Sequence, residues 1–220
     1  MAKLRLIFTK EAQASYISHL DTMRTFQRVF PRTELHIKHS NGFHPHPIIS
    51  IVLPLPVGQS SDCELLDFET VEETDGTGIA EKLNTGLPAG LRAIDCYPVT
   101  RPVREFAFLR AEMELIYDRG VPAGAADALR ELFARKELLI EKRTKHKSMT
   151  MIDAAPLLRS AALTEGEGTI TADVLVAAQN PGLNPAYLTQ AIERELPAFA
   201  PDFVRVRRRE IYDADLQVFR

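Results

Sequence analysis

The sequence has no tryptophan, only two cysteines and no long hydrophobic run in its 220 residues. Cys63 and Cys96 are isolated and form no CxxC pair, which argues against a disulfide framework and against a cysteine-held zinc or iron–sulfur site. No apolar stretch approaches the roughly 20 residues that a membrane helix needs. The first residues also lack the apolar core of a secretory signal. These absences predict a cytoplasmic protein with no membrane partner.

A strong charge of either sign is also missing. Lysine and arginine number 27 against 30 aspartates and glutamates, which gives a formal net charge of -3. The hydrophobic fraction of 45% and the charged fraction of 26% are those of an ordinary globular protein. A nucleic-acid-binding role would therefore rest on local basic patches. Two such patches exist, at residues 142–147 and 205–209.

Histidine is the residue that the chain concentrates in one place. Four of the six histidines lie between His36 and His46. The stretch 40–47 reads Ser-Asn-Gly-Phe-His-Pro-His-Pro. Its prolines bias the preceding residues toward extended geometry, and its glycine permits a positive φ. The pattern predicts a stiffened surface loop that presents its side chains.

Hydrophobic periodicity predicts the order β-α-β-β-α-β in each half of the chain. In the first half, strands are expected at residues 3–9, 34–38, 64–70 and 91–97, with a buried strand or strand end at 48–55, and helices at 18–30, stopped by Pro31, and at 77–87. In the second half, strands are expected at 109–117, 137–142, 169–176 and 203–212, helices after Pro122 and after Asn184, and an extended segment near Leu157 and Leu158. We predict an α+β protein of two tandem ferredoxin-like units with antiparallel sheets, residues 1–100 and 101–220.

Local patterns assign faces and helix ends within these elements. In the first strand, Leu4 and its alternate neighbours would face the core, whereas Arg5 would lie on a partly polar outer face. Ser18-His-Leu-Asp21 resembles a capping box. These residues are poorly placed for a catalytic triad, because neighbouring side chains at the start of a helix point in different directions.

The histidine loop is open to three interpretations. The first is a metal site in which His44 and His46 are joined by His19 or Asp21. The second is a phosphate or RNA contact, with Phe43 as a stacking face; its hydrogen-bonding groups would come from Lys38, His39, Ser40, Asn41 and His44. The third is a rigid proline turn whose histidines make only surface hydrogen bonds.

An arginine row forms a second candidate surface. Arg205, Arg207 and Arg209 alternate on one strand and would share a face with Phe203. Guanidinium groups beside an aromatic ring suit a phosphate backbone, but a solvated edge strand carries the same pattern to prevent aggregation. The basic residues at 142–147 are more typical of a solvated loop. The candidate binding residues are His19, Asp21, Asn41, Phe43, His44, His46, Arg205, Arg207 and Arg209, with no catalytic residue, metal or cofactor assigned.

Three motifs together resemble one bacterial family of unknown function. They are Ser-His-Leu-Asp at 18–21, Asn-Gly-Phe-His-Pro-His-Pro at 41–47 and Leu-Pro-Leu-Pro-Val-Gly at 53–58. In this order they resemble the radical-SAM-linked protein family, whose members occur fused to, or encoded beside, cobalamin-type radical SAM enzymes. The resemblance is specific over residues 3–98 and looser over 105–220, where residues 142–147 and 180–185 match best.

The resemblance implies a helper to a radical SAM enzyme. The chain lacks the Cys-x-x-x-Cys-x-x-Cys cluster motif, so it is not itself the radical enzyme. We expect a non-catalytic accessory or adaptor module, with RNA (tRNA or rRNA) or a translation-linked substrate as a possible ligand. One alternative is an RNA-processing endonuclease-like enzyme that uses a loop histidine as general acid or base. Another is a metal-binding or scaffold protein without nucleic acid.

Overall fold

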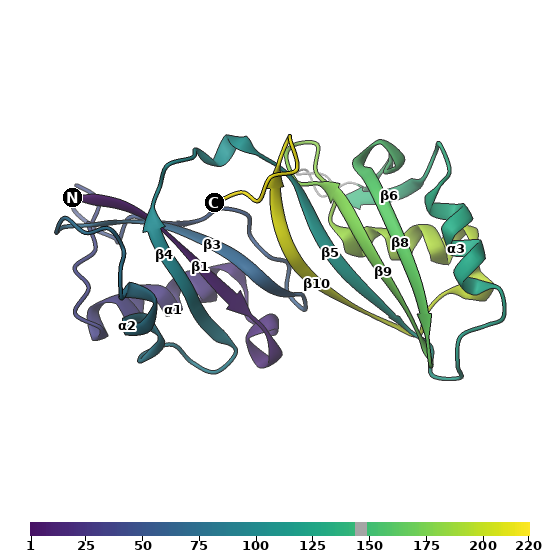
Figure 1. Ribbon diagram of the computed structural model, residues 1–220, viewed down its shortest axis with the longest axis horizontal. Helices are drawn as coiled ribbons and strands as arrows, with labels where there is room; N and C mark the ends of the chain where they lie inside the picture. Colours follow the sequence, from purple (N-terminus) through teal and green to yellow (C-terminus); the bar gives the residue numbers. More distant parts are fainter. Residues whose placement is uncertain (144–148) are drawn as a thin grey trace. The chain divides into compact units, whose positions relative to one another are not determined.

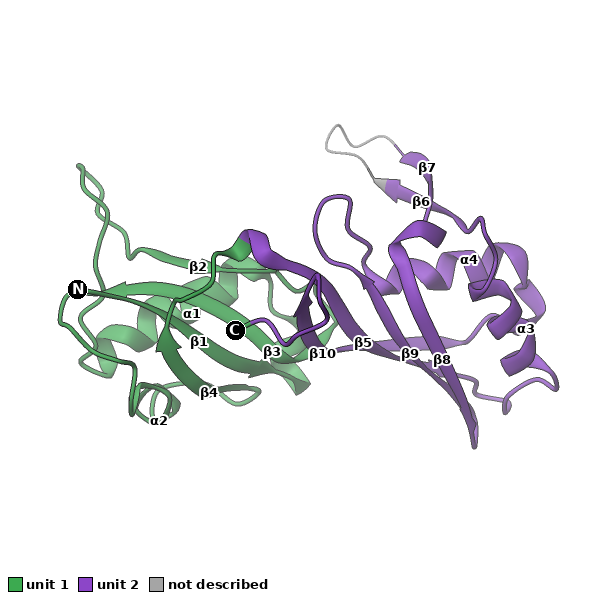
Figure 2. Ribbon diagram, turned by 45° about the horizontal axis from the view of Figure 1, so that its top comes forward, with its two compact units in different colours: residues 1–103, 220 green, residues 104–219 purple. Residues whose placement is uncertain are grey.

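The computed structural model describes residues 1–143 and 149–220. The chain is a mixed α/β protein whose strands pair in antiparallel fashion, with four α-helices among the described residues. It divides into two compact units, residues 1–103 with Arg220 and residues 104–219 (Figure 2). Within the described residues, none of the helices has the length and apolar character to cross a membrane.

Unit 1 is a small antiparallel sheet covered on one face by helices. Its elements are β1 (Ala2–Lys10), α1 (His19–Arg32), β2 (Ile49–Ile51), β3 (Ser60–Thr70), α2 (Ile79–Asn84) and β4 (Leu91–Pro98). The strands lie in the order β4-β1-β3-β2, and Figure 1 shows the first three of them side by side. The register pairs Leu4 with Phe68 and Arg5 with Asp67.

The core of unit 1 forms because alternate residues of each strand face the helices. Leu4, Leu6 and Phe8 are fully buried in one cluster with residues of α1 and α2. The ring of Phe8 meets the ring of Phe26 edge-to-face, with centroids 4.9 Å apart. Phe26 therefore packs α1 against β1.

Two sequence expectations for unit 1 are wrong, and a third holds in part. Pro31 does not stop the first helix, because α1 continues to Arg32; the amide N–H of Thr33 instead donates to carbonyls of the last turn. Residues 34–38 form no full strand and make only an isolated bridge, Ile37 with Thr70. Arg5 lies on the sheet face opposite the core residues Leu4 and Leu6, as expected, but its side chain is fully buried there.

Unit 2 has a four-stranded sheet and a separate hairpin. Its elements are β5 (Phe106–Ile116), α3 (Ala125–Phe133), β6 (Leu139–Arg143), β7 (Met149–Asp153), β8 (Leu158–Gly166), β9 (Thr169–Ala177), α4 (Leu188–Glu195) and β10 (Phe203–Asp213). The sheet order is β10-β5-β9-β8. The strands β6 and β7 pair only with each other among the described strands. The extended segment expected near Leu157 and Leu158 begins only at Leu158, the first residue of β8, because Ala155–Leu157 form a short 3-10 turn between β7 and β8.

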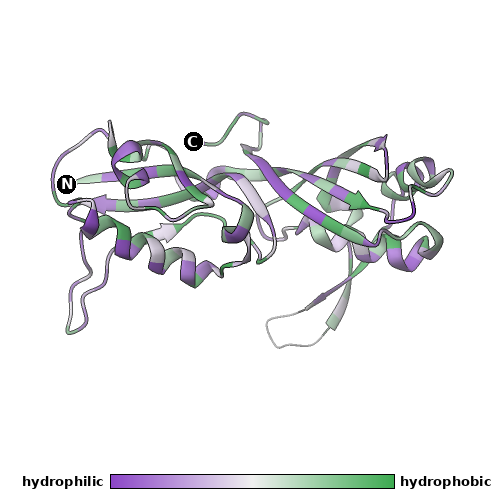
Figure 3. Cartoon of the chain, turned by 90° about the horizontal axis from the view of Figure 1, so that it is seen from below, coloured by the Kyte–Doolittle hydropathy of each residue, from purple (hydrophilic) through white to green (hydrophobic). Residues whose placement is uncertain are grey.

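The alternation along the strands of unit 2 separates its two faces. Figure 3 shows hydrophilic and hydrophobic bands that alternate along the strands. Met113 of β5 and Ala172 of β9 are fully buried, and the register places them side by side. Residues that alternate with them along the strands, such as Glu112, Glu114 and Asp173, are mostly charged or polar and form the opposite face. That face also carries the arginine row of β10.

Candidate functional site

The histidine-rich stretch forms a hairpin, residues 38–48, called the histidine hairpin below. The amide N–H of Ser40 donates to the carbonyl of His46, and that of Ile48 donates to the carbonyl of Lys38, both at 2.8 Å. The backbone of Lys38 in turn donates to Glu69 of β3 at 2.8 Å. In Figure 2 the loop that leads into β2 extends away from the sheet of unit 1. The hairpin is thus anchored at its base and free at its tip.

Ser40 and His46 brace the two arms of the hairpin. The Ser40 hydroxyl accepts the backbone N–H of His46 at 3.2 Å and lies 2.8 Å from Nδ1 of the same residue. Either the hydroxyl donates to Nδ1 or Nδ1–H donates to the hydroxyl, according to the tautomer of the imidazole. In both cases His46 keeps Nε2 for a hydrogen bond outside this pair.

The tip of the hairpin exposes an aromatic ring to solvent. Phe43 has a relative exposure of 101%, the highest of the large hydrophobic residues that the structure describes. Asn41 and His44 beside it are also exposed, and Gly42 has a φ of +132°, a conformation that suits glycine. A fully exposed phenylalanine contributes nothing to the packing of this chain.

The other two histidines near the hairpin are engaged at its base. Nδ1 of His39 lies 2.9 Å from the carbonyl oxygen of Ile37. Nδ1 of His36 lies 2.7 Å from a carboxylate oxygen of Glu72, and this contact lowers the pKa of Glu72 below its usual value. Both contacts hold the chain near the point where it leaves the sheet.

His19 and Asp21 lie at the other end of unit 1. Lys10, paired with Ser61 of β3, donates to the carbonyl of Ile17 just before α1. The histidine hairpin is anchored instead at Glu69 of β3. At about 3.3 Å per residue, the two anchor points on β3 are on the order of 25 Å apart. The structure therefore does not bring His19 to the hairpin histidines, and no three potential metal ligands converge within residues 1–143 and 149–220.

Asp21 acts as part of a helix cap. The Ser18 side chain accepts the backbone N–H of Asp21 at 3.1 Å and donates to its carboxylate at 2.7 Å. Asp21 also accepts from Arg24 at 3.0 Å. The hydrogen bond from Ser18, followed by that from Arg24, lowers the pKa of Asp21. The capping interpretation of the Ser-x-x-Asp motif is confirmed.

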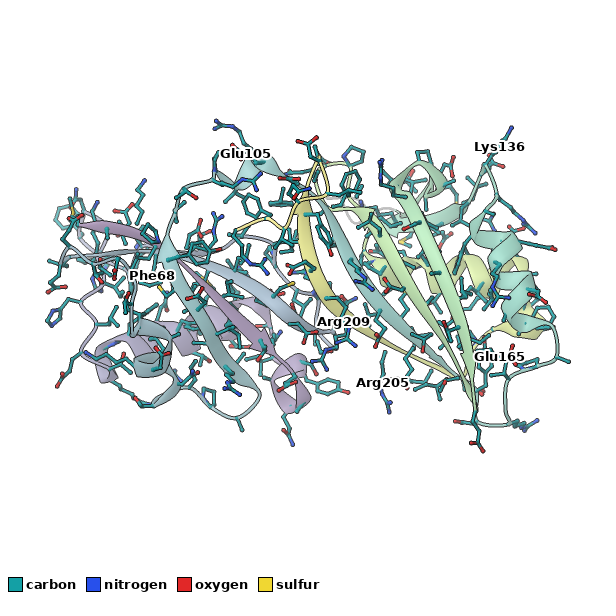
Figure 4. All side chains as sticks on the ribbon, in the orientation of Figure 1. Phe68, Glu105, Lys136, Glu165, Arg205 and Arg209 are labelled. Carbon is teal, nitrogen blue, oxygen red and sulfur yellow. The ribbon has the colours of Figure 1, made fainter. Side chains whose placement is uncertain are left out.

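The arginine row lies against carboxylates of the neighbouring strand. Arg205 contacts Glu114 at 3.0 Å, and Arg209 contacts Glu112 at 2.8 Å. Figure 4 shows Arg205 and Arg209 on β10. Arg207 lies between them in sequence and pairs in register with Glu112. Because these carboxylates offset positive charge, the row offers a weaker field to a phosphate backbone than its sequence indicates.

The second basic patch falls mostly outside the described residues. Residues 144–148 are among those that the structure does not describe, so the expectation of a solvated loop stays a prediction there. Lys142 lies within the described part, and its ammonium group donates to the carbonyl of Gly182 at 3.0 Å. This contact joins β6 to the loop 180–185 before α4.

Sequence reasoning missed a buried polar pair on the sheet of unit 1. The Arg5 guanidinium donates two hydrogen bonds to Asp67, at 2.7 and 2.9 Å. The two residues are 62 apart in sequence. Only the register between β1 and β3 makes them neighbours, so no local pattern could have found them.

Comparisons with known proteins identify a family for this chain and one solved structure with a similar fold. The family model described as "Uncharacterized protein conserved in bacteria (DUF2344)" matches residues 3–185. No curated protein matches the chain. A chain in the crystal structure of a Cbf5-Nop10-Gar1 complex is similar over 93% of this chain and 47% of that one, with 10% identity and a TM-score of 0.50. This chain therefore spans about half the length of that protein, and the likeness concerns the fold alone.

A second solved structure is similar over nearly the whole length of both chains. It is described as an unknown protein from Galdieria sulphuraria. The similarity covers 94% of this chain and 98% of that chain, with 11% identity and a TM-score of 0.28. That TM-score is too low to support any inference about this protein.

Proposed function

The chain belongs to the DUF2344 family of uncharacterized bacterial proteins, and from this premise we propose that it is a non-catalytic accessory module whose histidine hairpin docks on a partner radical SAM enzyme. The identity of the partner comes from the resemblance carried by the three motifs. The observation that carries the docking role is the complete exposure of Phe43 at the tip of a braced hairpin.

The hairpin has the features of a docking element. Its base is fixed to β3 by a backbone hydrogen bond, and the Ser40–His46 contact holds its arms together. A pre-ordered loop loses little conformational entropy when it binds. An exposed aromatic residue that enters a pocket of the partner is a typical hot spot of a protein interface. Phe43 would supply the apolar contact, and His46 a directional hydrogen bond beside it.

A matched pair of phenylalanines tests this proposal. In a binding assay with a cobalamin-type radical SAM enzyme of the kind that the resemblance implies, the substitution Phe43→Ala should weaken binding at least tenfold, because truncation of a hot-spot residue costs about 2 kcal/mol or more. Phe203→Ala removes another exposed ring, 54% accessible, and should leave affinity unchanged. Equal affinities for the wild type and the Phe43→Ala variant would contradict the proposal.

RNA is a second candidate ligand for the same hairpin. The ring of Phe43 is open for stacking on a base, and Asn41 and His46 offer hydrogen-bonding groups beside it. Filter binding of tRNA and rRNA fragments across a salt series tests this candidate. Retention that falls with salt and is lost in Phe43→Ala would support RNA, whereas no salt-dependent retention would remove it. Electrophoresis of the same labelled RNA after incubation would reveal any cleavage.

We also propose that both units have the ferredoxin-like topology. In unit 1 the four strands lie in the order fourth, first, third, second (β4-β1-β3-β2). In unit 2 the order β10-β5-β9-β8 follows the same rule if β6 and β7 are treated as an insertion. In each unit one helix follows the first of these strands and another precedes the last. This arrangement supports the proposal of a repeated β-α-β-β-α-β unit.

A further inference from the structure

Unit 1 has a pocket on the face of its sheet that the helices do not cover. Its volume is about 410 Å³, within the range of small-molecule sites. The floor is made by side chains of β1 and β3 that alternate with the core residues. One wall is Ile48 to Ser50, and the other is the segment after β4, residues 99–103. The amide N–H of Val99 donates to the carbonyl of Lys3 at 2.9 Å and fixes this second wall to β1.

The floor of the pocket is polar and ordered. Arg5 is fully buried, and two hydrogen bonds join it to Asp67. Next to this pair, Glu69 accepts from Lys38 at 2.7 Å, and this contact lowers the pKa of Glu69. Both carboxylates thus have cationic partners within the unit. The floor is preorganised before any ligand arrives.

Lys3 is the cation best placed to take a ligand. Its ammonium group lies 3.7 Å from Glu69, a carboxylate that also accepts from Lys38 at 2.7 Å, and its side chain is 74% exposed. At the floor, the three cations Lys3, Arg5 and Lys38 share the two carboxylates of Asp67 and Glu69. These five groups carry an excess of one positive charge. The pocket therefore favours an anion over a cation.

The walls of the pocket favour a ligand with an apolar body. Ile48, Val99, Pro102 and Val103 contribute aliphatic surface around the polar floor. From this combination we propose that the pocket binds a small amphipathic carboxylate, with its apolar body between the walls and its carboxylate at Lys3. A single excess charge matches a monoanion. The carboxylate can belong to a free acid or to the C-terminal residue of a peptide, which share this chemistry.

Titration of the full chain with 3-phenylpropionate, followed by amide chemical shifts, tests the proposal. We expect saturable shifts at the pocket residues, with a dissociation constant of about 1 mM, as for a ligand of this size. 3-Phenylpropylamine has the same body with the opposite charge and should bind at least about fivefold more weakly. A peptide that ends in a phenylalanine carboxylate, compared with its C-terminal amide, tells the two sources apart.

Three variants complete the test. Lys3→Glu should weaken 3-phenylpropionate binding about fivefold by removing one ion pair and adding repulsion. Ser50→Trp should abolish binding by filling the pocket, since Ser50 is an exposed residue of its wall. Lys82→Glu makes the same charge change at an exposed site on α2, outside the pocket, and should bind like the wild type.

Several outcomes would overturn the proposal. They are the absence of saturable shifts in the wild type, equal binding of the amine, unchanged affinity in Lys3→Glu, and tighter binding of adenosine monophosphate than of 3-phenylpropionate. Phe43 lies at the tip of the histidine hairpin and does not line the pocket, whose wall includes only Ile48 from the base of that hairpin, so Phe43→Ala should leave the titration unchanged. Failure here would therefore leave the docking proposal intact.

Discussion

Two phenylalanines of unit 1 show how the role of a residue follows from its surroundings. Phe26 is fully buried between β1 and the rest of α1, in contact with Phe8 and Phe30. Phe43 is fully exposed at the tip of the histidine hairpin. The ring of Phe26 stabilises the fold, whereas the ring of Phe43 makes no contribution to its stability. The same residue type is thus part of the core in one place and exposed to solvent in another.

Alanine substitutions should separate these two roles. Phe26→Ala should lower the free energy of unfolding by about 3–5 kcal/mol, because it removes a buried ring and leaves a cavity. Phe43→Ala should change it by less than about 0.5 kcal/mol, because no packing is lost. Urea unfolding followed by circular dichroism measures both values. A large destabilisation by Phe43→Ala would mean that the hairpin packs on another surface.

The Lys38–Glu69 contact makes a second prediction at this scale. The ammonium of Lys38 holds the pKa of Glu69 below its ordinary value of 4.5. A carboxylate whose pKa is lowered by folding stabilises the protein above its unfolded pKa, and this contribution is lost as the pH falls through the folded pKa. Lys38→Met should raise the pKa of Glu69 and reduce the stability difference between pH 7 and pH 3. NMR titration of the Glu69 carboxyl group measures the shift, and an unchanged pKa would contradict the assignment.

Short elements of this protein are fixed by serine side chains. Ser18 caps α1 through Asp21, and Ser40 braces the histidine hairpin through His46. The first contact was readable from the sequence, because helix caps follow a local spacing rule. The second was not, because the pairing of the two arms sets it.

Serine-to-alanine substitutions should affect these two elements separately. Ser18→Ala should destabilise the protein by about 1 kcal/mol, as expected for loss of an N-cap. Ser40→Ala should change global stability by no more than about 1 kcal/mol, because its hydrogen bonds are exposed. It should, however, speed hydrogen exchange at the amides of the histidine hairpin. If Ser18→Ala accelerated exchange in the hairpin and Ser40→Ala did not, the two serines would have been assigned wrongly.

The whole molecule is built from two units that each have a hydrophobic core. In unit 1, Ile79 of α2 belongs to the cluster around Phe8 and Phe26. In unit 2, Ile192 of α4 is fully buried. Each core is made by the inward residues of a sheet and by the helices that cover them. The two halves thus satisfy the same packing requirement with different residues.

Matched substitutions in the two cores should have additive effects. Ile79→Val and Ile192→Val should each lower the unfolding free energy by about 0.5–1.5 kcal/mol. Residues in separate cores share no partners, so the double variant should equal the sum within about 0.5 kcal/mol. Chemical denaturation of the four proteins gives the comparison. A coupling energy above that limit would show that the two sites share structure.

Long alternating stretches made most of the fold predictable. The expected strands near 3–9, 109–117, 169–176 and 203–212 are all present, as β1, β5, β9 and β10. The cap at Asn184 was also predicted, and its side chain accepts the amide N–H of Ala186. The weaker predictions concerned short elements such as β2 and the bridge at Ile37, where few residues carry the pattern and tertiary pairing decides.

The sequence alone determined the elements, the cap at Ser18 and the unusual character of residues 40–47, because each depends on neighbours within a few positions. Tertiary structure decided which of these features meet. It placed His19 far from the hairpin, set carboxylates of β5 against Arg205 and Arg209, and buried Arg5 beside Asp67. Strand register sets which of these residues become neighbours. Register depends on how whole faces of the sheet pack, and this cannot be derived from the spacing of residues along the sequence.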